Sequence, residues 1–548
     1  MTDEAGSTEP LRGGPGRGDA GSRLDRAFLP VVTVAFLLVC TVPYAVAAWR
    51  TPPGTEFSGV LYNHFDTSYY RASQRSTARA LPHANRFTAE PGAPDRVPPL
   101  YPLLGRVQRL TGLPAFVVYH LPRVLAAGAL PALLAYLFGL CFPGRRETVR
   151  WAVLFALFTA GVLTLAPGLA IAARSGERIP ESNIAYSFTV FPHFAVSYVG
   201  LTLAFTALAM ALRGRPVRLV AATGVGAGVL LGLGHAFLLL PFVVVFSGVL
   251  VVAAALRVRG GGPSGGLTQL AAVMTVGISA APFVFLLHRV QARLETLQGF
   301  SFSDAYLPDR WWTWALGFGV VSLLALAGAV AVFRTRSRDP LVWLLLAWIG
   351  AQLGFIYLPS AVFQRRFSEG LIVPIAGVAG VGAALIGGSA RAARSVRGGL
   401  VAVLLLGVLT IGKNLGASGE YVPNELGDLA ALVNRSDVVL AGAPVSAILP
   451  AISDGTAYAA RLLETLQYAA KRSAATRYAV DPASAASRRW LAGEGITLVV
   501  VQAGDPSFAL RALDDADAAC LETTFRRGDL TAYRVQPECL SAAGGGGG

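Results

Sequence analysis

Long apolar runs recur along the first three quarters of the chain and then stop. Between Phe28 and Ile411 they have the length of about 20 residues that crosses the hydrocarbon core of a bilayer. The pattern predicts eleven membrane-spanning helices. We expect them at Phe28–Trp49, Phe116–Cys141, Trp151–Ala173, Ser187–Leu212, Leu219–Gly234, Ala236–Leu256, Thr268–Arg289, Trp312–Phe333, Leu341–Leu358, Gly370–Ser389 and Gly399–Ile411.

One pair of these runs allows a second interpretation. The fifth and sixth runs are short and meet at Gly234-His235, so they could form one broken or re-entrant unit instead of two helices. Either arrangement returns the chain to the same side of the membrane, so the predicted topology does not depend on the choice.

The composition agrees with a polytopic α-helical membrane protein. The chain is 54% hydrophobic and 14% charged, with a mean hydropathy of +0.54. A water-soluble protein of this size needs more polar surface than that.

Arginine clusters lie in alternate connections between the apolar runs. They are RLDR before the first run, Arg145 to Arg150, and then RGRPVR, RVRG, RTRSR and RAARSVR. The positive-inside rule places these connections, and the N-terminus, on the cytoplasmic side. An odd number of helices then puts the C-terminal region outside. The clusters also account for the net charge of +14 as a topology signal, so no nucleic acid partner is expected.

The chain divides into four parts. Residues 1–27 are rich in Gly, Pro, Ser and Arg and are expected to be a disordered cytoplasmic tail. Residues 28–412 form the transmembrane domain, with a long outer loop at 51–115. Residues 413–540 have a soluble α/β pattern and are expected to be an extracytoplasmic domain, and residues 541–548 are a Gly-rich tail.

The α/β pattern consists of short alternating segments. We expect a helix near Pro423–Asn434, a strand at Val438–Ala443, a helix at Arg461–Arg472, a strand at Ile496–Gln502 and a hairpin around Gly528. Cys520 and Cys539 flank the hairpin closely enough to be bridged, and an oxidising compartment would permit it, but the sequence does not decide whether they are.

Polar and ionisable residues gather in the outer loops. These are Glu56 to Pro102, Arg174 to Asn183, Gly299 to Trp312 and Pro359 to Gly370. The cytoplasmic connections hold little besides arginine, so we expect the protein to act on the outer side.

Asp66 is the leading catalytic candidate. It lies in NHFDTSYY, the first aspartate beyond the first predicted helix, with Tyr69 and Tyr70 beside it as substrate-binding candidates. A partly dehydrated carboxylate next to aromatic rings can take a proton from a hydroxyl group. The alternative is that Asp66 caps a helix beginning at Thr67, a common role for aspartate.

Glu181 is a second acidic candidate, in ERIPESN ahead of the fourth predicted helix. Together with Asp66 it could bind substrate hydroxyls, or a divalent metal ion if the two sides converge. The alternative is a solvated loop. The six histidines show no HxxxH or HxxE spacing, which argues against a zinc site.

FQRRFSEG carries Arg365 and Arg366 at the outer edge, against the trend of the other arginines. Adjacent guanidinium groups suit a phosphate, and the same loop holds Gln364 and Glu369 as substrate-binding candidates. The alternative is that the arginines reach to lipid headgroups.

His193 and His235 lie at helix ends and could also bond a phosphate oxygen, or be ordinary packing residues. No P-loop and no GxSxG is present, so a nucleotide-driven pump or a lipase-type hydrolase has no support.

The segments NHFDTSYYRA, PPLYPLLGRVQRLTGLP, PESNIAYSFTVFPHFA, GHAFLLLP and FQRRFSEGLIVPIAG resemble a group of bacterial membrane proteins of the GT-C superfamily of integral-membrane glycosyltransferases. The resemblance implies a multi-pass protein of the bacterial cytoplasmic membrane that moves a sugar, with inversion, from a polyprenyl-phosphate donor to an extracytoplasmic glycan or glycolipid acceptor. It assigns the general base to Asp66, while Arg365 and Arg366 fit the donor phosphate by position.

The first loop lacks the DD, DE or ED pair of many GT-C enzymes. The sequence therefore does not decide whether the protein binds a metal ion or whether it is catalytic. The alternatives are a flippase or carrier for lipid-linked glycans and a non-catalytic assembly component. A carrier normally needs ionisable groups inside its helices, and here the charges are expected at helix ends.

Overall fold

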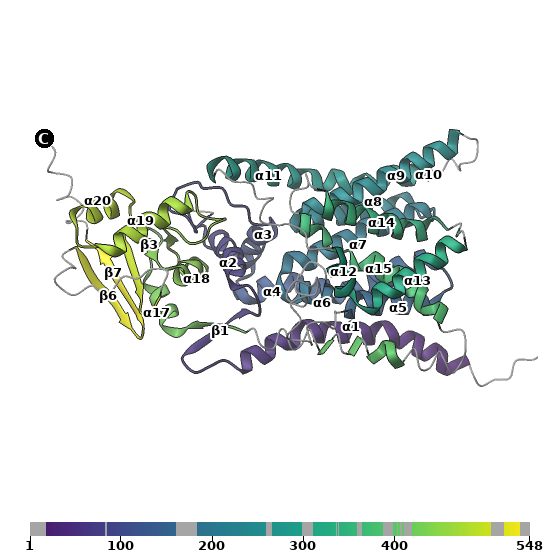
Figure 1. Ribbon diagram of the computed structural model, residues 1–548, viewed down its shortest axis with the longest axis horizontal. Coiled ribbons are helices and arrows are strands. Elements are labelled where there is room, and N and C mark those ends of the chain that lie inside the picture. The colour runs from purple at the N-terminus through teal and green to yellow at the C-terminus, as the bar shows by residue number, and fades with distance from the viewer. Residues whose placement is uncertain are drawn as a thin grey trace, which may run out of the picture.

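The computed structural model describes residues 18–82, 85–159, 183–258, 266–298, 311–335, 337, 339–358, 364–386, 398–402, 404–405, 408–409, 419–505 and 520–536. Figure 1 shows two layers, with a bundle of helices on one side and a smaller domain of helices and strands on the other.

The bundle contains the helices α1 (Gly18–Trp49), α4 (Ala115–Cys141), α5 (Arg146–Phe158), α6 (Ile184–Val190), α7 (Pro192–Leu212), α8 (Val217–Leu233), α9 (Leu239–Val258), α10 (Gly266–Val273), α11 (Thr275–Gln298), α12 (Trp311–Phe318), α13 (Val320–Arg334), α14 (Pro340–Tyr357) and α15 (Ile372–Ile386). Two short 3-10 turns, η5 (Ala236–Leu238) and η7 (Gln364–Ser368), precede α9 and α15.

Within the described residues, 7 helical segments are long and apolar enough to cross a membrane. They are Arg26–Trp49, Ala115–Cys141, Pro192–Leu212, Ala236–Leu256, Gly266–Leu297, Pro340–Tyr357 and Gln364–Ile386. Each matches one of the eleven predicted spans. Two further predictions correspond to the shorter apolar helices α8 and α13, and the spans predicted at 151–173 and 399–411 lie partly outside the described residues.

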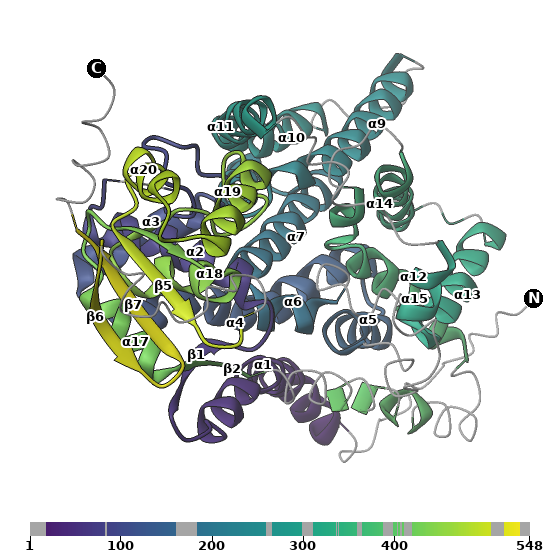
Figure 2. The same cartoon turned by 60° about the vertical axis from the view of Figure 1, so that its left-hand side comes forward.

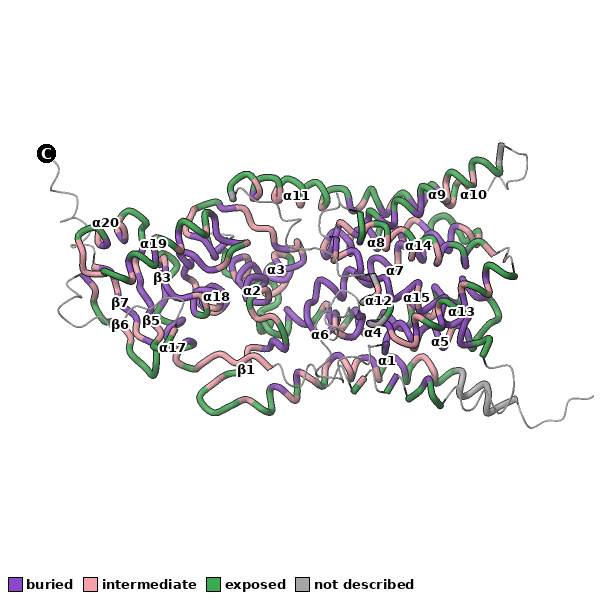
Figure 3. The backbone as a smooth tube through the Cα atoms, viewed as in Figure 1, coloured by how far each residue is buried: buried purple, intermediate pink, exposed green. Residues whose placement is uncertain are grey.

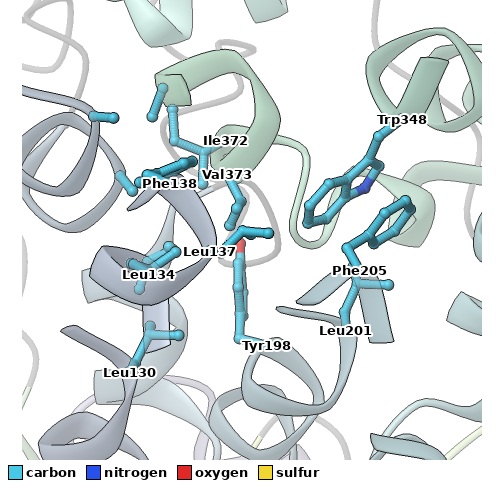
Figure 4. Close-up of a cluster of buried hydrophobic side chains, with 14 of the residues drawn as sticks. Leu130, Leu134, Leu137, Phe138, Tyr198, Leu201, Phe205, Trp348, Ile372 and Val373 are labelled. Atoms are coloured by element: carbon cyan, nitrogen blue, oxygen red, sulfur yellow. The ribbon is translucent and has the colours of Figure 1, made fainter. Parts of the chain in front are cut away.

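The bundle core is a continuous set of buried apolar side chains (Figure 4). Leu137 of α4 lies beside Tyr198 of α7, and Phe205 of α7 stacks on Trp348 of α14 with 3.6 Å between ring centroids. Glycines allow the closest approach: a Cβ on Gly382 of α15 or Gly328 of α13 would lie 2.1 Å from a backbone oxygen of the other helix. Small residues commonly mediate such packing between membrane helices.

The span predicted at Ser187–Leu212 is broken at Phe191, between α6 and α7. Pro192 has no N–H, so the carbonyl of Phe188 loses its usual helical donor. Nη1 of Arg123 supplies one instead, at 3.1 Å from that oxygen, and also donates to the carbonyl of Cys40 at 2.6 Å. The side chain of Arg123 is buried inside the bundle. The expectation that charges lie only at helix ends was therefore wrong for this residue.

The second layer, which we call the outer layer after the predicted topology, combines the loop that follows α1 with the C-terminal region. The loop contributes β1 (Thr55–Val60), α2 (His64–Arg79) and α3 (Leu100–Thr111). The C-terminal region contributes β2 (Glu420–Pro423), α17 (Asn424–Leu432), β3 (Val438–Ala441), α18 (Ala443–Ile452), β4 (Thr456–Ala457), α19 (Tyr468–Val480), α20 (Ala485–Gly493), β5 (Leu498–Gln502), β6 (Leu521–Arg527) and β7 (Leu530–Val535).

The outer sheet has five strands in the order β4-β3-β5-β7-β6 (Figure 2). β3 is parallel to β4 and β5, whereas β7 is antiparallel to β5 and β6. The alternation of helices and strands, and the hairpin around Gly528, are as predicted. The helix predicted at Arg461–Arg472 was wrong in its first half, because α19 begins only at Tyr468.

Thr465 explains that difference. Its hydroxyl donates to the carbonyl of Phe87 at 2.6 Å and accepts from the backbone N–H groups of Ala460 and Arg461. These bonds hold the segment as a loop against the first outer loop, in the way that Ser and Thr side chains often compete with helical hydrogen bonds.

The first outer loop and the C-terminal region pack as one body. β1 and β2 form an antiparallel ribbon, and the backbone N–H of Ala457 donates to the carbonyl of Arg86 at 2.9 Å. The buried guanidinium of Arg86 donates to the carbonyls of Ser453, at 2.8 Å, and Gly455. Figure 3 shows the buried segments α2 and α18 in the middle of the molecule, where these parts meet.

Cys520 is disulfide-bonded, whereas Cys40 and Cys141 are buried free thiols. The expected partner, Cys539, lies outside the described residues, as do the N-terminal residues 1–17 and the Gly-rich tail.

Replacing Arg86 by methionine should destabilise the outer layer by about 3 kcal/mol, because two charge-assisted hydrogen bonds to buried carbonyls are lost. Thermal unfolding of the purified protein measures it. Arg79→Met is the matched control: its guanidinium also pairs across this interface, with Asp454, but is 52% exposed, so we expect a loss within ~1 kcal/mol. Equal losses in the two variants would contradict the proposed role of Arg86.

Candidate active site

A cavity lies where the outer layer meets the outer ends of the membrane helices. It encloses about 860 Å³ of empty space, including the part that is open to solvent. Its lining comes from α2, the loop before α3, the break between α8 and α9, α11, η7 and the loop before α19. The polar and ionisable lining residues are Asp66, Tyr69, Tyr70, Arg96, His235, Gln291, Arg366 and Glu464.

Asp66 lies in the first turn of α2 and faces this cavity. The helix begins at His64 and its cap is Asn63, whose side chain accepts a hydrogen bond from the backbone N–H of Asp66 at 3.2 Å. Nδ2 of Asn63 donates in return to Oδ2 of Asp66 at 2.6 Å. The interpretation of Asp66 as the cap of a helix starting at Thr67 was therefore wrong, and its carboxylate is available to the cavity.

The C-terminal region supplies the cation next to Asp66. Nη2 of Arg461 lies 2.6 Å from Oδ1 of Asp66, and Nε of Arg461 lies 3.5 Å from Oε2 of Glu464. Glu464 is 1% exposed and also pairs with Arg96 at 2.8 Å. Burial lowers the pKa of Arg461, but the carboxylates of Glu464 and Asp66 outweigh it and raise that pKa overall. Arg461 therefore stays charged.

Sequence reasoning missed this contribution. Arg461 is 395 residues from Asp66 in the chain, and its segment was predicted to be a helix of the extracytoplasmic α/β domain. The local sequence does not indicate that Arg461 pairs with Asp66. Its only signal is that Arg461 and Glu464, two ionisable residues, are three residues apart in a segment predicted to lie outside.

Tyr69 and Tyr70 form one wall of the cavity. The hydroxyl of Tyr69 donates to Oδ1 of Asp95 at 2.5 Å and accepts from the backbone N–H of Arg96 at 3.1 Å. Burial, with the Asp95 carboxylate adding to it, raises the pKa of Tyr69 well above its usual range, so the hydroxyl remains a donor. Tyr70 stacks on Tyr101 with 4.5 Å between ring centroids.

The membrane bundle contributes His235 to the lining, and His235 pairs with the buried carboxylate of Glu369. Nδ1 of His235 donates to Oε2 of Glu369 at 2.5 Å, and the two side chains are 4% and 0% exposed. Nε2 of His235 has no hydrogen-bond partner among the described residues. His193 lies behind it, with the two rings 4.7 Å apart, and its Nδ1 is 2.7 Å from the hydroxyl of Tyr101.

The loop at η7 is held by Gln352 of α14. Its buried Nε2 donates to the carbonyls of Phe367, at 2.9 Å, and Glu369, at 2.6 Å. This places Arg366 on the cavity. Gln352 was missed from the sequence, because it is one polar residue inside an apolar run.

The structure brings some of the predicted site residues to the cavity and not others. Asp66, Tyr69, Tyr70, His235 and Arg366 line the cavity, while Glu369 and His193 support His235 from behind. Gln364 does not line it, and its amide donates to the carbonyl of Leu358. Arg365 is also outside the lining. Glu181 lies outside the described residues, and within them no group of three or more His, Cys, Asp or Glu side chains could hold a metal ion.

Solved structures share this fold at low sequence identity. The Archaeoglobus fulgidus oligosaccharyltransferase, tethered to an acceptor peptide, is 12% identical with a TM-score of 0.53, and the match covers 88% of this chain and 70% of that one. Arabinofuranosyltransferase AftD from Mycobacteria is 13% identical with a TM-score of 0.54, covering 93% of this chain and 40% of AftD. ArnT from Cupriavidus metallidurans, in the apo state, is 13% identical with a TM-score of 0.50, covering 95% of this chain and 99% of ArnT.

No family model and no curated protein sequence matches the chain. Identities this low show the fold alone. That fold, a polytopic helical bundle followed by a mixed α/β region, is the fold of GT-C membrane glycosyltransferases, and it confirms the resemblance seen in the sequence.

Gln352→Leu should destabilise the protein by about 3 kcal/mol, because two buried carbonyls lose their donor while the size of the side chain changes little. Thermal unfolding in detergent is the measurement. An unchanged midpoint would show that the η7 loop does not depend on Gln352.

Proposed function

We propose that this protein is a membrane glycosyltransferase that moves a sugar from a polyprenyl-phosphate donor to an extracytoplasmic glycan or glycolipid, with inversion and with Asp66 as general base. The observation that carries the proposal is a cavity, in a GT-C fold, that is lined by Asp66 of α2 and by His235 and Arg366 of the membrane bundle.

The reaction needs a proton acceptor at the attacking hydroxyl. Each oxygen of Asp66 has one donor, Arg461 or Asn63, and a carboxylate oxygen can accept a second hydrogen bond. An acceptor hydroxyl bound there would pass its proton to Asp66 as its oxygen bonds to the anomeric carbon. The bond from that carbon to the phosphate oxygen breaks on the opposite face, which inverts the configuration.

The leaving group needs positive charge and hydrogen-bond donors. The electron pair of the broken bond goes to the donor phosphate, which departs with an extra negative charge. Arg366 would stabilise it by charge-assisted hydrogen bonds, and His235 faces the same space. Arg365 precedes Arg366 on the same loop but does not line the cavity, so Arg366 is the stronger assignment.

An apolar groove supports the donor assignment. It runs between α9 and α14, from Leu212 and Pro340 at one end to Phe355 and Leu358 at the other, with about 1970 Å³ of empty space including its open side. Leu358 is tied to the η7 loop through Gln364. A prenyl chain in this groove would bring its phosphate to the loop that carries Arg366.

Asp66→Asn should abolish sugar transfer and leave donor binding intact, because an amide keeps the shape of the side chain but cannot accept the proton. The assay is transfer by purified protein from a panel of polyprenyl-phosphate sugars to glycan and glycolipid acceptors, with donor binding measured separately. Glu56→Gln, at an exposed acid of the same loop, is the matched control and should be fully active.

Three other outcomes are informative. Transfer that survives Asp66→Asn would keep the enzyme and move the base, with Glu181 as the next candidate. Donor binding without transfer by the wild type would favour the carrier. Neither binding nor transfer would favour an assembly component.

Arg461→Gln should lower kcat by about 10 to 100-fold, with little change in the KM of the donor, because Asp66 loses the charge-assisted hydrogen bond that orients it. Arg461→Lys should restore part of the loss. The control is Arg435→Gln, at an exposed arginine of the same region that lies 3.9 Å from Asp454. A change in KM alone would contradict the positioning role.

A further inference from the structure

A second hollow lies beside the cavity, between α3 and α11. It encloses about 1430 Å³ of empty space, including its open side. Arg96, Pro99, Phe283 and Leu287 line both this hollow and the cavity, so the two adjoin at these four residues. We call it the α3/α11 groove.

The two walls of the α3/α11 groove differ in chemistry. One wall is apolar and comes from α8 and α11, with Val229, Leu233, Leu286 and Val290. The other wall comes from α2, α3 and the loop between them, and it carries the polar groups Ser73, Ser76, Asp95 and Arg106. A groove of this kind matches an amphiphile, with chains on one side and a hydroxyl-rich or anionic head on the other.

The groove opens at the level of the outer membrane surface. α3 exposes two leucines, Leu103 and Leu110, together with Arg106 and Arg109 between them, a mixture that suits a helix in the bilayer interface. On α11, Ile278 and Phe285 are 68% and 63% exposed, so this helix faces lipid. Figure 1 shows α11 extending from the bundle along the edge of the outer layer.

The groove reaches the cavity at the side of Asp66. Arg96, which lines both hollows, pairs with Glu464, and Glu464 lies beside the Arg461 that holds Asp66. The apolar groove between α9 and α14 shares no lining residue with the α3/α11 groove. Two membrane-embedded molecules could therefore approach the cavity from different sides, one toward Arg366 and one toward Asp66.

We propose that the α3/α11 groove admits the acceptor, and that the acceptor is a glycolipid of the outer leaflet whose chains lie against α8 and α11 while a head-group hydroxyl reaches Asp66. This rests on the proposed glycosyltransferase function and selects the glycolipid over the soluble glycan. A water-soluble acceptor would gain nothing from a lateral apolar wall, because its affinity comes from polar contacts alone.

Two variants on one helix separate the groove from the general lipid surface. Leu286 lines the groove and is 52% exposed, whereas Ile278 is exposed on the same helix but lines none of the three hollows described above. Leu286→Trp should obstruct the groove and Ile278→Trp should not. Both positions are exposed, so both variants should fold.

The first experiment compares transfer to a diglucosyl diacylglycerol and other glycolipids with transfer to the same head groups after deacylation. We expect the intact lipid to be preferred by at least about tenfold in kcat/KM, since chain burial adds affinity. Leu286→Trp should lower transfer to the intact lipid toward the level of the deacylated head groups, and Ile278→Trp should behave like the wild type with both kinds of acceptor.

Equal use of intact and deacylated acceptors, or equal effects of the two Trp variants, would overturn the glycolipid proposal while the transferase function stands. Transfer to no acceptor at all would remove the transferase function, and the glycolipid proposal with it.

A second experiment does not depend on turnover. p-Benzoylphenylalanine replaces Leu286 or Ile278 in protein reconstituted into vesicles of phosphatidylcholine and diglucosyl diacylglycerol, and mass spectrometry identifies the lipid adducts after illumination. At position 286 the ratio of glycolipid to phosphatidylcholine adducts should exceed the ratio of the two lipids in the vesicle. At position 278 the two ratios should be equal. The same ratio at both positions would overturn the proposal.

Discussion

The ion pair between Asp66 and Arg461 is the contact on which the proposed site depends. It joins the first turn of α2, which follows the first membrane helix, to a loop of the C-terminal region at a distance of 2.6 Å. Glu464 and Arg96 extend the pair into a four-residue network across the same boundary. Because neither segment can form this network alone, the catalytic candidate is oriented only when the outer layer is assembled.

The assembly of that layer follows from backbone hydrogen bonding. Arg86 fills a position where two carbonyls of the C-terminal region would otherwise be buried without donors, and Thr465 ties the opposite segment to Phe87. Polar groups reach the membrane side of the cavity because the bundle helices are interrupted at two places. The helices break at Gly234-His235 and at η7, and such breaks expose backbone and polar side chains at the outer end of an otherwise apolar bundle.

Periodicity and length were enough to predict much of this fold. The seven described spans and the β3, β5 and hairpin strands follow from apolar runs that do not depend on distant contacts. The sequence also pointed to five of the residues that line the cavity, because each is a polar residue in a segment predicted to lie on the outer side. They are Asp66, Tyr69, Tyr70, His235 and Arg366.

The remainder depends on contacts far apart in the chain. Arg461 and Glu464 acquire their positions from Phe87 and Asp66, and the helix expected there fails because Thr465 bonds elsewhere. The cap of α2 is Asn63, three residues before the aspartate that was considered for that role. Arg123 and Gln352 donate to backbone carbonyls 15 to 83 residues away in the chain, so their partners are not evident from the local sequence.

The most direct test of the account is a structure of the protein in lipid nanodiscs with a polyprenyl phosphate bound. The account predicts the phosphate in the outer cavity, in contact with Arg366 and beside Nε2 of His235, with the prenyl chain in the groove between α9 and α14 and the Asp66 carboxylate facing the same space. A phosphate bound elsewhere, with the outer cavity closed to it, would contradict the central claim that this cavity is a glycosyl-transfer site.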